Sequence, residues 1–160
     1  MACKSSEGVA AVDLPALFSD LVRCETRLYN ALNDRLRERH AIVTSQFEAL
    51  RYLRDHPGAR VADLAAEFAI GVGATSKIVD RLEKQKWAVR QPNPSDRRSS
   101  LLVLTDDGSQ LVDEAEKTFA GGLDELIGGT LVGSSAAATA QALAKLRSVL
   151  EHGQTGTPTG

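Results

Sequence analysis

The stretch NPSDRRSSLLVLTDDG, from Asn93 to Gly108, constrains the fold of this chain more than any other part of it. Its first half is rich in turn-forming residues and holds two adjacent arginines, and an aliphatic run follows at once. That run ends at Thr105, which can cap a helix, and the two aspartates after it suit the positive end of a helix dipole. The stretch therefore predicts a hairpin with a cationic tip whose second strand leads directly into a helix.

The residues before this hairpin predict two short helices joined by a tight turn. The segment RVADLAAEFA has apolar residues at helical spacing, and a second helix is expected over 72–86, after the glycine-containing turn IGVG. Ile78, Val79 and Leu82 share one side of that second helix, and its other side is polar or small. This outline is typical of a helix-turn-helix, and a hairpin that follows one is called a wing.

Longer helices are expected on both sides of this unit. Apolar residues recur at steps of three and four from Leu14 to Leu36, so one helix should begin at Asp13, with Pro15 in its first turn, and end near RLRERH. A helix over TSQFEALRYLRD should be capped by Thr44 or Ser45 and stopped by Pro57 and Gly58. After Thr105, one helix should run to about Ile127, and an Ala-rich helix, AAATAQALAKLRSVLEH, should follow.

The charge of the chain is unevenly distributed. The net charge is -2, which by itself argues against a nucleic-acid binder. Residues 71–100, however, hold seven basic and three acidic residues, a net charge of +4, so the rest of the chain carries -6. One basic region on an acidic body is the pattern expected of a nucleic-acid-binding surface. A solvated helix face would explain the lysines but not the cationic turn.

Other classes of function find little support in the sequence. No apolar run approaches the ~20 residues that span a bilayer, and no signal peptide is visible, so we expect a cytoplasmic protein with no membrane partner. Cys3 and Cys24 do not form a disulfide framework, and a lone helical cysteine such as Cys24 is more often a packing residue than a redox sensor. The three histidines, His40, His56 and His152, are too scattered for a zinc site. We expect no metal, cofactor or enzymatic activity, because no Ser/His/Asp set or phosphate loop is present.

The order of these elements resembles the MarR family of bacterial transcriptional regulators. SDRRSSLLVLTDDG is similar to the wing signature of that family, which is Asp-x-Arg, an aliphatic strand and then Leu-Thr-x-x-Gly. IVDRLEKQKWAVR resembles the end of the recognition helix, and VTSQFEALRYL resembles the helix before the motif. The similarity covers about 13–151, which is nearly all of the chain outside its tails.

The resemblance implies a mainly α fold, a winged helix-turn-helix with N- and C-terminal dimerisation helices and a small β-hairpin wing. It implies an obligate homodimer that binds double-stranded DNA at a pseudo-palindromic operator and acts as a repressor. The expected division is a disordered tail over 1–11, a dimerisation helix over 12–40, a DNA-binding lobe over 41–105, dimerisation helices over 106–152 and a disordered tail over 153–160.

By the same resemblance, the helix over 72–86 would enter the major groove and the wing over 92–100 the minor groove. Arg98 would be the wing-tip residue and Asp96 the carboxylate that orients it. An arginine suits a narrow minor groove because that groove concentrates negative potential and guanidinium is weakly hydrated. The candidate DNA-binding residues are Gly73, Ser76, Lys77, Arg81 and Lys84 on the helix and Asp96, Arg97 and Arg98 on the wing.

The forward positions of the expected recognition helix are small, at Gly71, Gly73 and Ala74. Small residues permit close backbone approach but offer few hydrogen bonds to base edges, so Ser76 and Lys77 are the best candidates for reading bases. Arg81 could bind a phosphate or pair with a carboxylate of the fold. A second hypothesis, a winged-helix scaffold for protein-protein contact, draws its support from this glycine-rich helix and is opposed by Asp96, Arg97 and Arg98.

The resemblance also implies release of DNA when a small molecule, often aromatic and anionic, binds between the dimer helices and the DNA-binding lobe. Arg23, Arg27, His40 and Trp87 are the candidates for such a ligand pocket. Each has a plainer interpretation: solvated or paired arginines, a histidine that caps a helix end, and a tryptophan packed at the base of the wing. Cys24 lies about one turn later than the cysteine of redox-sensing relatives.

Overall fold

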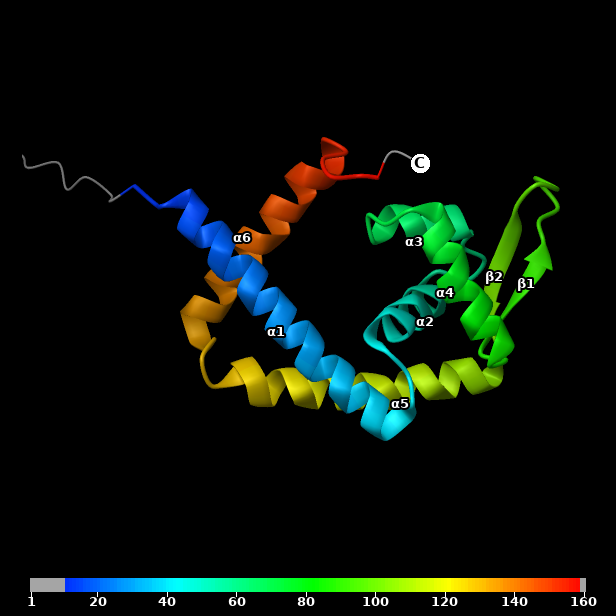
Figure 1. Cartoon of the computed structure of the whole chain (residues 1–160), viewed down its shortest axis with the longest axis horizontal. Coiled ribbons are helices and arrows are strands. Elements are labelled where there is room, and N and C mark those ends of the chain that lie inside the picture. Colours follow the sequence, from blue (N-terminus) through cyan, green and yellow to red (C-terminus); the bar gives the residue numbers. More distant parts are fainter. Residues whose placement is uncertain (1–10, 159–160) are drawn as a thin grey trace, which may run out of the picture.

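The structure, a computed structural model, describes residues 11–158 and is dominated by helices (Figure 1). The elements in chain order are α1 (Leu14–His40), α2 (Thr44–Asp55), α3 (Val61–Glu67), α4 (Val72–Lys84), β1 (Ala88–Pro92), β2 (Ser100–Leu104), α5 (Asp106–Leu123), the π-helix η1 (Asp124–Gly128) and α6 (Gly133–His152). The mainly α fold with a small hairpin is the one that the sequence predicts.

Helix α1 begins and ends where local chemistry indicates. The Asp13 carboxylate accepts a hydrogen bond from the Ala16 N–H at 3.1 Å, and Pro15 lies in the first turn, which confirms the predicted start. At the other end, Ala41 adopts a left-handed conformation with φ 55°, and its N–H donates to the Arg37 carbonyl. Of the apolar stripe along α1, Leu32 and Leu36 are buried, and the half from Leu14 to Val22 is exposed.

The core lies where α2, α4, the hairpin and α5 meet the C-terminal half of α1. Its largest fully buried side chains come from every one of these elements and from α3: Leu36, Ile42, Phe47, Leu50, Leu53, Leu64, Val79, Leu82, Leu102 and Val112. The hairpin is antiparallel, with Ala88 opposite Leu104 and Pro92 opposite Ser100. In Figure 1 this lobe occupies one end of the molecule, with the hairpin at its outer edge.

The start of α2 and the end of α4 differ from the sequence-based expectation. Neither Thr44 nor Ser45 caps α2: the cap residue is Val43, whose N–H donates to Gln46 Oε1 at 3.0 Å. Thr44 is buried instead, and its N–H donates to Asn33 Oδ1 of α1 at 3.1 Å. Because this bond joins Thr44 of α2 to α1, a contact between two helices takes the place of the local cap that was expected at Thr44.

Helix α4 ends at Lys84 and does not continue to residue 86. Lys86 is left-handed, with φ 62°. Its N–H donates to the Glu83 carbonyl at 2.9 Å, and the Trp87 N–H donates to the Leu82 carbonyl at 3.0 Å. This pair of bonds is a Schellman turn, which reverses the chain into β1 without a loop.

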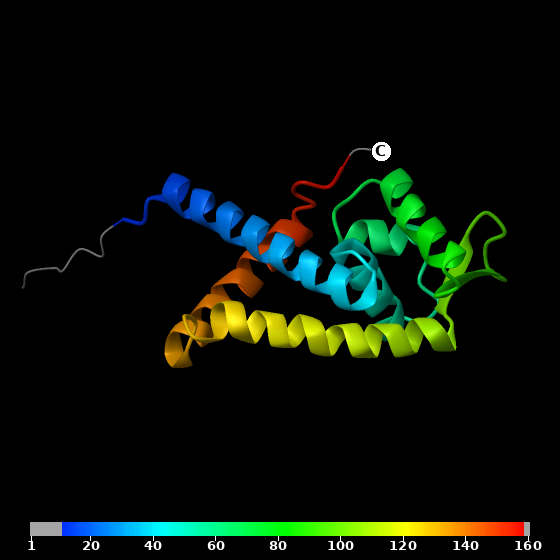
Figure 2. The same cartoon turned by 60° about the horizontal axis from the view of Figure 1, so that its bottom comes forward.

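Helix α5 passes beneath α1 and the lobe, and α6 then crosses back toward the N-terminal half of α1 (Figures 1 and 2). The predicted helix end near Ile127 falls within η1, so the helical path continues as a π turn beyond α5. No residue of α6 is buried. A disordered tail is expected over 153–160. In the structure, residues 153–156 form turns after α6, and the Thr155 N–H donates to the Leu150 carbonyl. The N-terminal tail and Cys3 lie outside the described residues, apart from Ala11.

Candidate functional site

Helix α4 presents a small and basic outer face. Val79 and Leu82 are buried and Ile78 packs against the core, while Gly73, Lys77, Arg81 and Lys84 are exposed and Ser76 is half-buried. Thr75 is buried, and its Oγ1 donates to the Gly71 carbonyl at 3.1 Å across the first turn. A Cβ atom placed on Gly73 would meet no atom within 4 Å. No contact within the described chain therefore requires glycine at this position.

The tip of the hairpin is a turn held by short polar side chains. Asn93 Oδ1 accepts from the Ser95 N–H at 3.0 Å, and Asn93 Nδ2 donates to Ser99 Oγ at 2.9 Å. Asp96 Oδ1 accepts from the Arg98 backbone N–H at 2.9 Å. The carboxylate of Asp96 thus binds the backbone of Arg98, and within residues 11–158 it forms no ion pair with the Arg98 guanidinium. Both Arg97 and Arg98 are exposed.

Arg90 of β1 connects the hairpin to α4 through the two carboxylates of that helix. Its backbone N–H donates to Glu83 Oε1 at 3.0 Å, its Nη1 bonds to Glu83 Oε2, and its Nη2 donates to Asp80 Oδ1 at 2.8 Å. Asp80 and Glu83 are the only acidic residues of α4. Both acidic groups of the helix are thus bound by one guanidinium.

The remaining cations of this region are left without carboxylate partners. Within residues 11–158, none of the following six forms an ion pair: Lys77, Arg81, Lys84, Lys86, Arg97 and Arg98. Of the two interpretations of Arg81, pairing with a carboxylate of the fold is therefore not found. Cations that lack internal partners are available to bind an anion outside the chain.

The base of the wing is joined tightly to α5. Thr105 Oγ1 accepts from the Gly108 N–H at 3.1 Å, as the sequence predicts for a cap, and also donates to the Lys86 carbonyl at 2.7 Å. The Thr105 N–H donates to the Trp87 carbonyl at 3.1 Å. Gly108 is buried against the same carbonyl, so close that a Cβ atom there would lie 1.9 Å from the Trp87 oxygen. Sequence reasoning placed the cap but gave no reason for Gly108.

The four candidate pocket residues lie on three parts of the molecule. Arg23 and Arg27 are exposed on α1, His40 Nε2 lies 2.8 Å from Thr118 Oγ1 of α5, and the half-buried Trp87 packs against the core. The position of Trp87 fits its plainer interpretation, whereas His40 bonds across to α5 and does not cap α1, whose cap residue is Ala41. Cys24 is a free cysteine exposed on α1 in the described chain.

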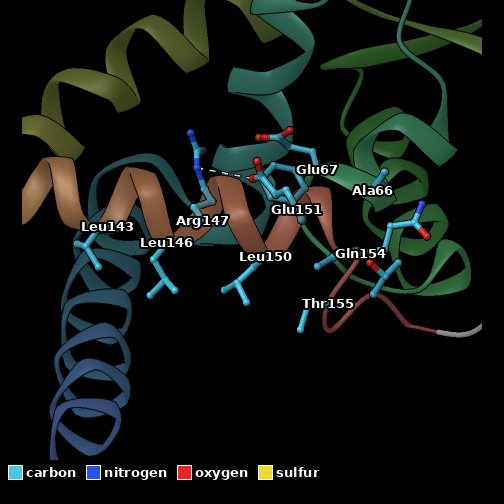
Figure 3. Close-up of a pocket in the computed structure, with 12 residues that line it drawn as sticks. Ala66, Glu67, Leu143, Leu146, Arg147, Leu150, Glu151, Gln154 and Thr155 are labelled. Carbon is cyan, nitrogen blue, oxygen red and sulfur yellow. Dashed lines mark ion pairs between the residues drawn. The ribbon is translucent and has the colours of Figure 1, made fainter. Parts of the chain in front are cut away.

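A groove of about 650 Å³ lies elsewhere, between the end of α3 and the end of α6 (Figure 3). Its apolar lining includes Phe68, Leu143, Leu146 and Leu150, and none of the four candidate pocket residues lines it. Arg147 and Glu151 of α6 lie on the side toward Glu67 in Figure 3, with Arg147 Nε 3.6 Å from Glu151 Oε1. Its charged lining therefore comprises two carboxylates and one guanidinium.

Among residues 11–158, no group of three or more His, Cys, Asp or Glu side chains is arranged to hold a metal ion. No helix in the described part of the chain combines the length and apolar character needed to cross a membrane.

Residues 43–99, which run from the start of α2 to the far side of the wing tip, match the model of the MarR family. The segment that holds the helix-turn-helix and the wing is therefore similar to the MarR family. Members of this family are transcriptional regulators and not enzymes.

Individual relatives are distant in sequence. The multiple antibiotic resistance protein MarR of Salmonella typhimurium is 28% identical over 107 residues, which are 63% of this chain and 74% of that protein. The HTH-type transcriptional repressor NicR of Pseudomonas putida is 33% identical over 72 residues, or 45% of this chain and 46% of the relative. The aligned parts thus leave a third or more of this chain unmatched.

Solved structures of MarR-family proteins share the fold over most of the chain. Wild-type MarR from E. coli has a TM-score of 0.68 at 25% identity and covers 88% of this chain and 98% of its own. Sco3205, a MarR family transcriptional regulator from Streptomyces coelicolor solved in complex with DNA, has a TM-score of 0.78 at 20% identity, covering 91% and 93%. The helices outside the matched segment 43–99 are therefore also those of a MarR-family fold.

Proposed function

We propose that this MarR-family regulator is a homodimeric repressor that binds a pseudo-palindromic DNA operator, with α4 in the major groove and the wing over 92–100 in the minor groove. The observation that carries the proposal is the set of six cations on α4 and the hairpin that lack ion-pair partners within residues 11–158. Binding of phosphates by lysine and arginine supplies most of the affinity of such proteins for DNA. Sco3205, a relative in fold, has been solved with DNA bound.

Within this proposal, α4 and the wing have different tasks. Lys77 is exposed on α4 and can donate to the acceptors of guanine, and Ser76 can bind either kind of base edge. Gly73 is exposed with open space around it, so the α4 backbone can approach DNA closely there. Arg81 and Lys84 would bind phosphates, and Arg98 at the turn held by Asp96 would enter the minor groove, with Arg97 beside it.

The dimer is proposed because two long helices expose apolar side chains that the rest of the described chain covers only in part. On α1, Leu14, Phe18 and Leu17 are 68%, 67% and 54% exposed. On α6, Leu143, Leu146, Val149 and Leu150 are exposed along much of the helix. Large apolar patches on a protein surface mark contact sites, and a second copy would cover both helices at once.

The proposal is tested by fluorescence anisotropy with the DNA upstream of the gene of this protein, a scrambled duplex and genomic fragments selected for binding. The wild type should bind one duplex tightly, and binding should weaken steeply as salt rises. Arg98→Ala should weaken it by about tenfold, or about 1.4 kcal/mol. Lys117→Ala, which removes a charge from α5, is the control and should leave affinity nearly unchanged. Weak, equal binding to every duplex would favour the protein-contact scaffold.

Regulation by a small molecule is the last part of the proposal. The groove between α3 and α6 joins the helix-turn-helix to a proposed dimer helix, so a molecule bound there would affect both. Of its two carboxylates, Glu151 pairs with the single guanidinium of Arg147 and Glu67 does not, which favours a neutral or cationic molecule over an anion. Titration of small aromatic amines and aromatic carboxylates into the protein-DNA complex tests this preference. Release of DNA by the carboxylates alone would contradict it.

A further inference from the structure

Arg90 lies between the two elements that are proposed to contact DNA. We propose that Arg90 is a positioning residue: it binds both carboxylates of α4, which keeps the lysines of that helix available to phosphates, and holds the wing against α4. The inference rests on the proposed function, in which α4 and the wing bind DNA. It assigns Arg90 a role through other residues and not a contact with DNA.

The contacts of Arg90 account for the whole acidic content of α4. The guanidinium reaches Asp80 with Nη2 and Glu83 with Nη1, and the backbone N–H adds a bond to the second oxygen of Glu83. The Arg90 and Glu83 side chains are 26% and 31% exposed, whereas that of Asp80 is 60% exposed. The pair with Glu83 is therefore the better shielded from solvent and is the firmer of the two attachments.

Without Arg90, the carboxylates of α4 would have other partners nearby. Asp80 is three residues after Lys77 and four before Lys84, and side chains at these helical spacings are neighbours. In the structure neither lysine is paired with Asp80, which is bound by Arg90 instead. A guanidinium binds two carboxylates in a fixed geometry, whereas an ammonium is a single point charge, so Arg90 competes well.

Loss of Arg90 should therefore weaken DNA binding in two ways. Asp80 would be free to pair with Lys77 or Lys84, and Glu83 would stand as an unpaired anion close to phosphates. The wing would also lose its attachment to α4. Both effects, unlike a direct contact between Arg90 and DNA, depend on the presence of the two carboxylates.

A double-mutant cycle separates these cases. Arg90→Gln is made in the wild type and in the Asp80→Asn/Glu83→Gln background, and affinity is measured on the duplex that the wild type binds most tightly. We expect a loss of at least tenfold in the wild type and of less than threefold when the carboxylates are absent. Arg97→Gln is the matched control: it removes a charge that pairs with no carboxylate in residues 11–158, so its loss should be equal in both backgrounds.

Each outcome of the cycle decides the inference. Equal losses for Arg90→Gln in both backgrounds would show a direct DNA contact and overturn it, as would no loss in the wild type. Thermal unfolding of all variants measures the fraction of each that is folded. A loss of affinity that only matches a loss of folded protein would also overturn the inference. Failure of the wild type itself to bind any duplex would overturn the proposed function, and that is seen before any variant is measured.

Discussion

At the scale of single residues, Gly108 shows how one position can determine whether two elements meet. The residue is buried in the first turn of α5, and the Trp87 carbonyl lies where a side chain would begin. The glycine is needed for this close approach and not for an unusual backbone angle, since its φ is not among the positive ones. The last residue of LTDDG therefore has a packing role at the base of the wing.

Gly108→Ala should destabilise the protein by about 3 kcal/mol or more, because the backbone of Trp87 cannot move aside as a flexible side chain would. Urea unfolding at one fixed protein concentration measures the change. Gly121→Ala is the control on the same helix, where a Cβ atom meets nothing within 4 Å. It should be neutral or stabilise by up to about 1 kcal/mol. Equal stability of the two variants would contradict the close approach at Gly108.

Asp96 offers a second test at this scale, because its oxygen binds a backbone N–H. Asp96→Asn keeps an oxygen acceptor in place, so DNA affinity should stay at or above that of the wild type. Asp96→Ala removes the acceptor and should weaken binding by about threefold to tenfold, from a hydrogen bond of about 1 kcal/mol. Anisotropy titration compares the two. A large loss in Asp96→Asn would instead show that the negative charge itself is needed.

Residue-level expectations from the sequence succeeded where the partner is close in the chain. The cap by Thr105 and the start of a helix at Asp13 are confirmed, and each depends on a bond to a residue three positions away. Thr44 bonds to Asn33, which lies 11 residues earlier on another helix. Gly108 packs against the carbonyl of Trp87, which lies before the hairpin. Those contacts depend on how elements pack, which a local pattern does not contain.

At the scale of elements, an ion-pair group joins α2 to α5 on the surface of the lobe. Arg54 Nη1 and Nη2 donate to the two oxygens of Glu116 at 2.6 and 3.1 Å, and Nη1 also donates to Asp113 at 3.1 Å. The hydrogen bonds from Arg54 hold the pKa of Glu116 below its ordinary value. The folded state thus favours the ionised form of this carboxyl.

Because the pKa of Glu116 is lowered on folding, the pair stabilises fully above the ordinary glutamate pKa of about 4.3 and is lost as pH falls through the lowered value. Arg54→Met should cost about 1 kcal/mol at pH 7, since the side chains are part-exposed. The difference from wild type should shrink below about pH 4. Urea unfolding across this range measures it, with Arg37→Met as the control. A difference that is constant with pH would contradict the assignment.

The elements themselves were largely predictable, and their ends less so. Apolar spacing predicts α1, α2, α3, α4 and the hairpin, because each buries one side against the same core. The end of α4 at Lys84 depends on a left-handed lysine and two backbone bonds, which no apolar pattern reveals. The bond network of Arg90 was likewise missed, since Asp80 lies ten residues away and Glu83 seven.

At the scale of the whole molecule, the N-terminal half of α1 exposes apolar side chains that a folded protein normally buries. The sequence predicts the apolar stripe of α1 but not what covers it. Apolar periodicity indicates which side of a helix is buried, but it does not indicate which partner buries that side. Leu32 and Leu36 are covered by the chain itself, while Leu14 and Phe18 are not. The stripe is thus divided between the core and a surface that we assign to a second copy.

Phe18→Glu should shift the protein from dimer to monomer, because a carboxylate would be buried in the apolar contact. Sedimentation velocity at several concentrations measures the change, and DNA affinity should fall with it, since two lobes no longer bind together. Thr26→Glu is the matched control: it adds the same charge to an exposed position of α1 outside the stripe. A dimer that survives Phe18→Glu would contradict the assignment of this surface.

The short, hydrogen-bonded connection between the wing and α5 should make these two elements move as one rigid unit. β2 ends at Leu104 and α5 begins at Asp106, and the one residue between them is bonded to both Lys86 and Trp87. At about 1.5 Å per residue, the 18 residues of α5 make an arm about 27 Å long. A slight tilt at its far end, near α6, would therefore swing the wing through a much larger arc. The angle at which two such arms meet would set the spacing of the DNA grooves that the pair can span.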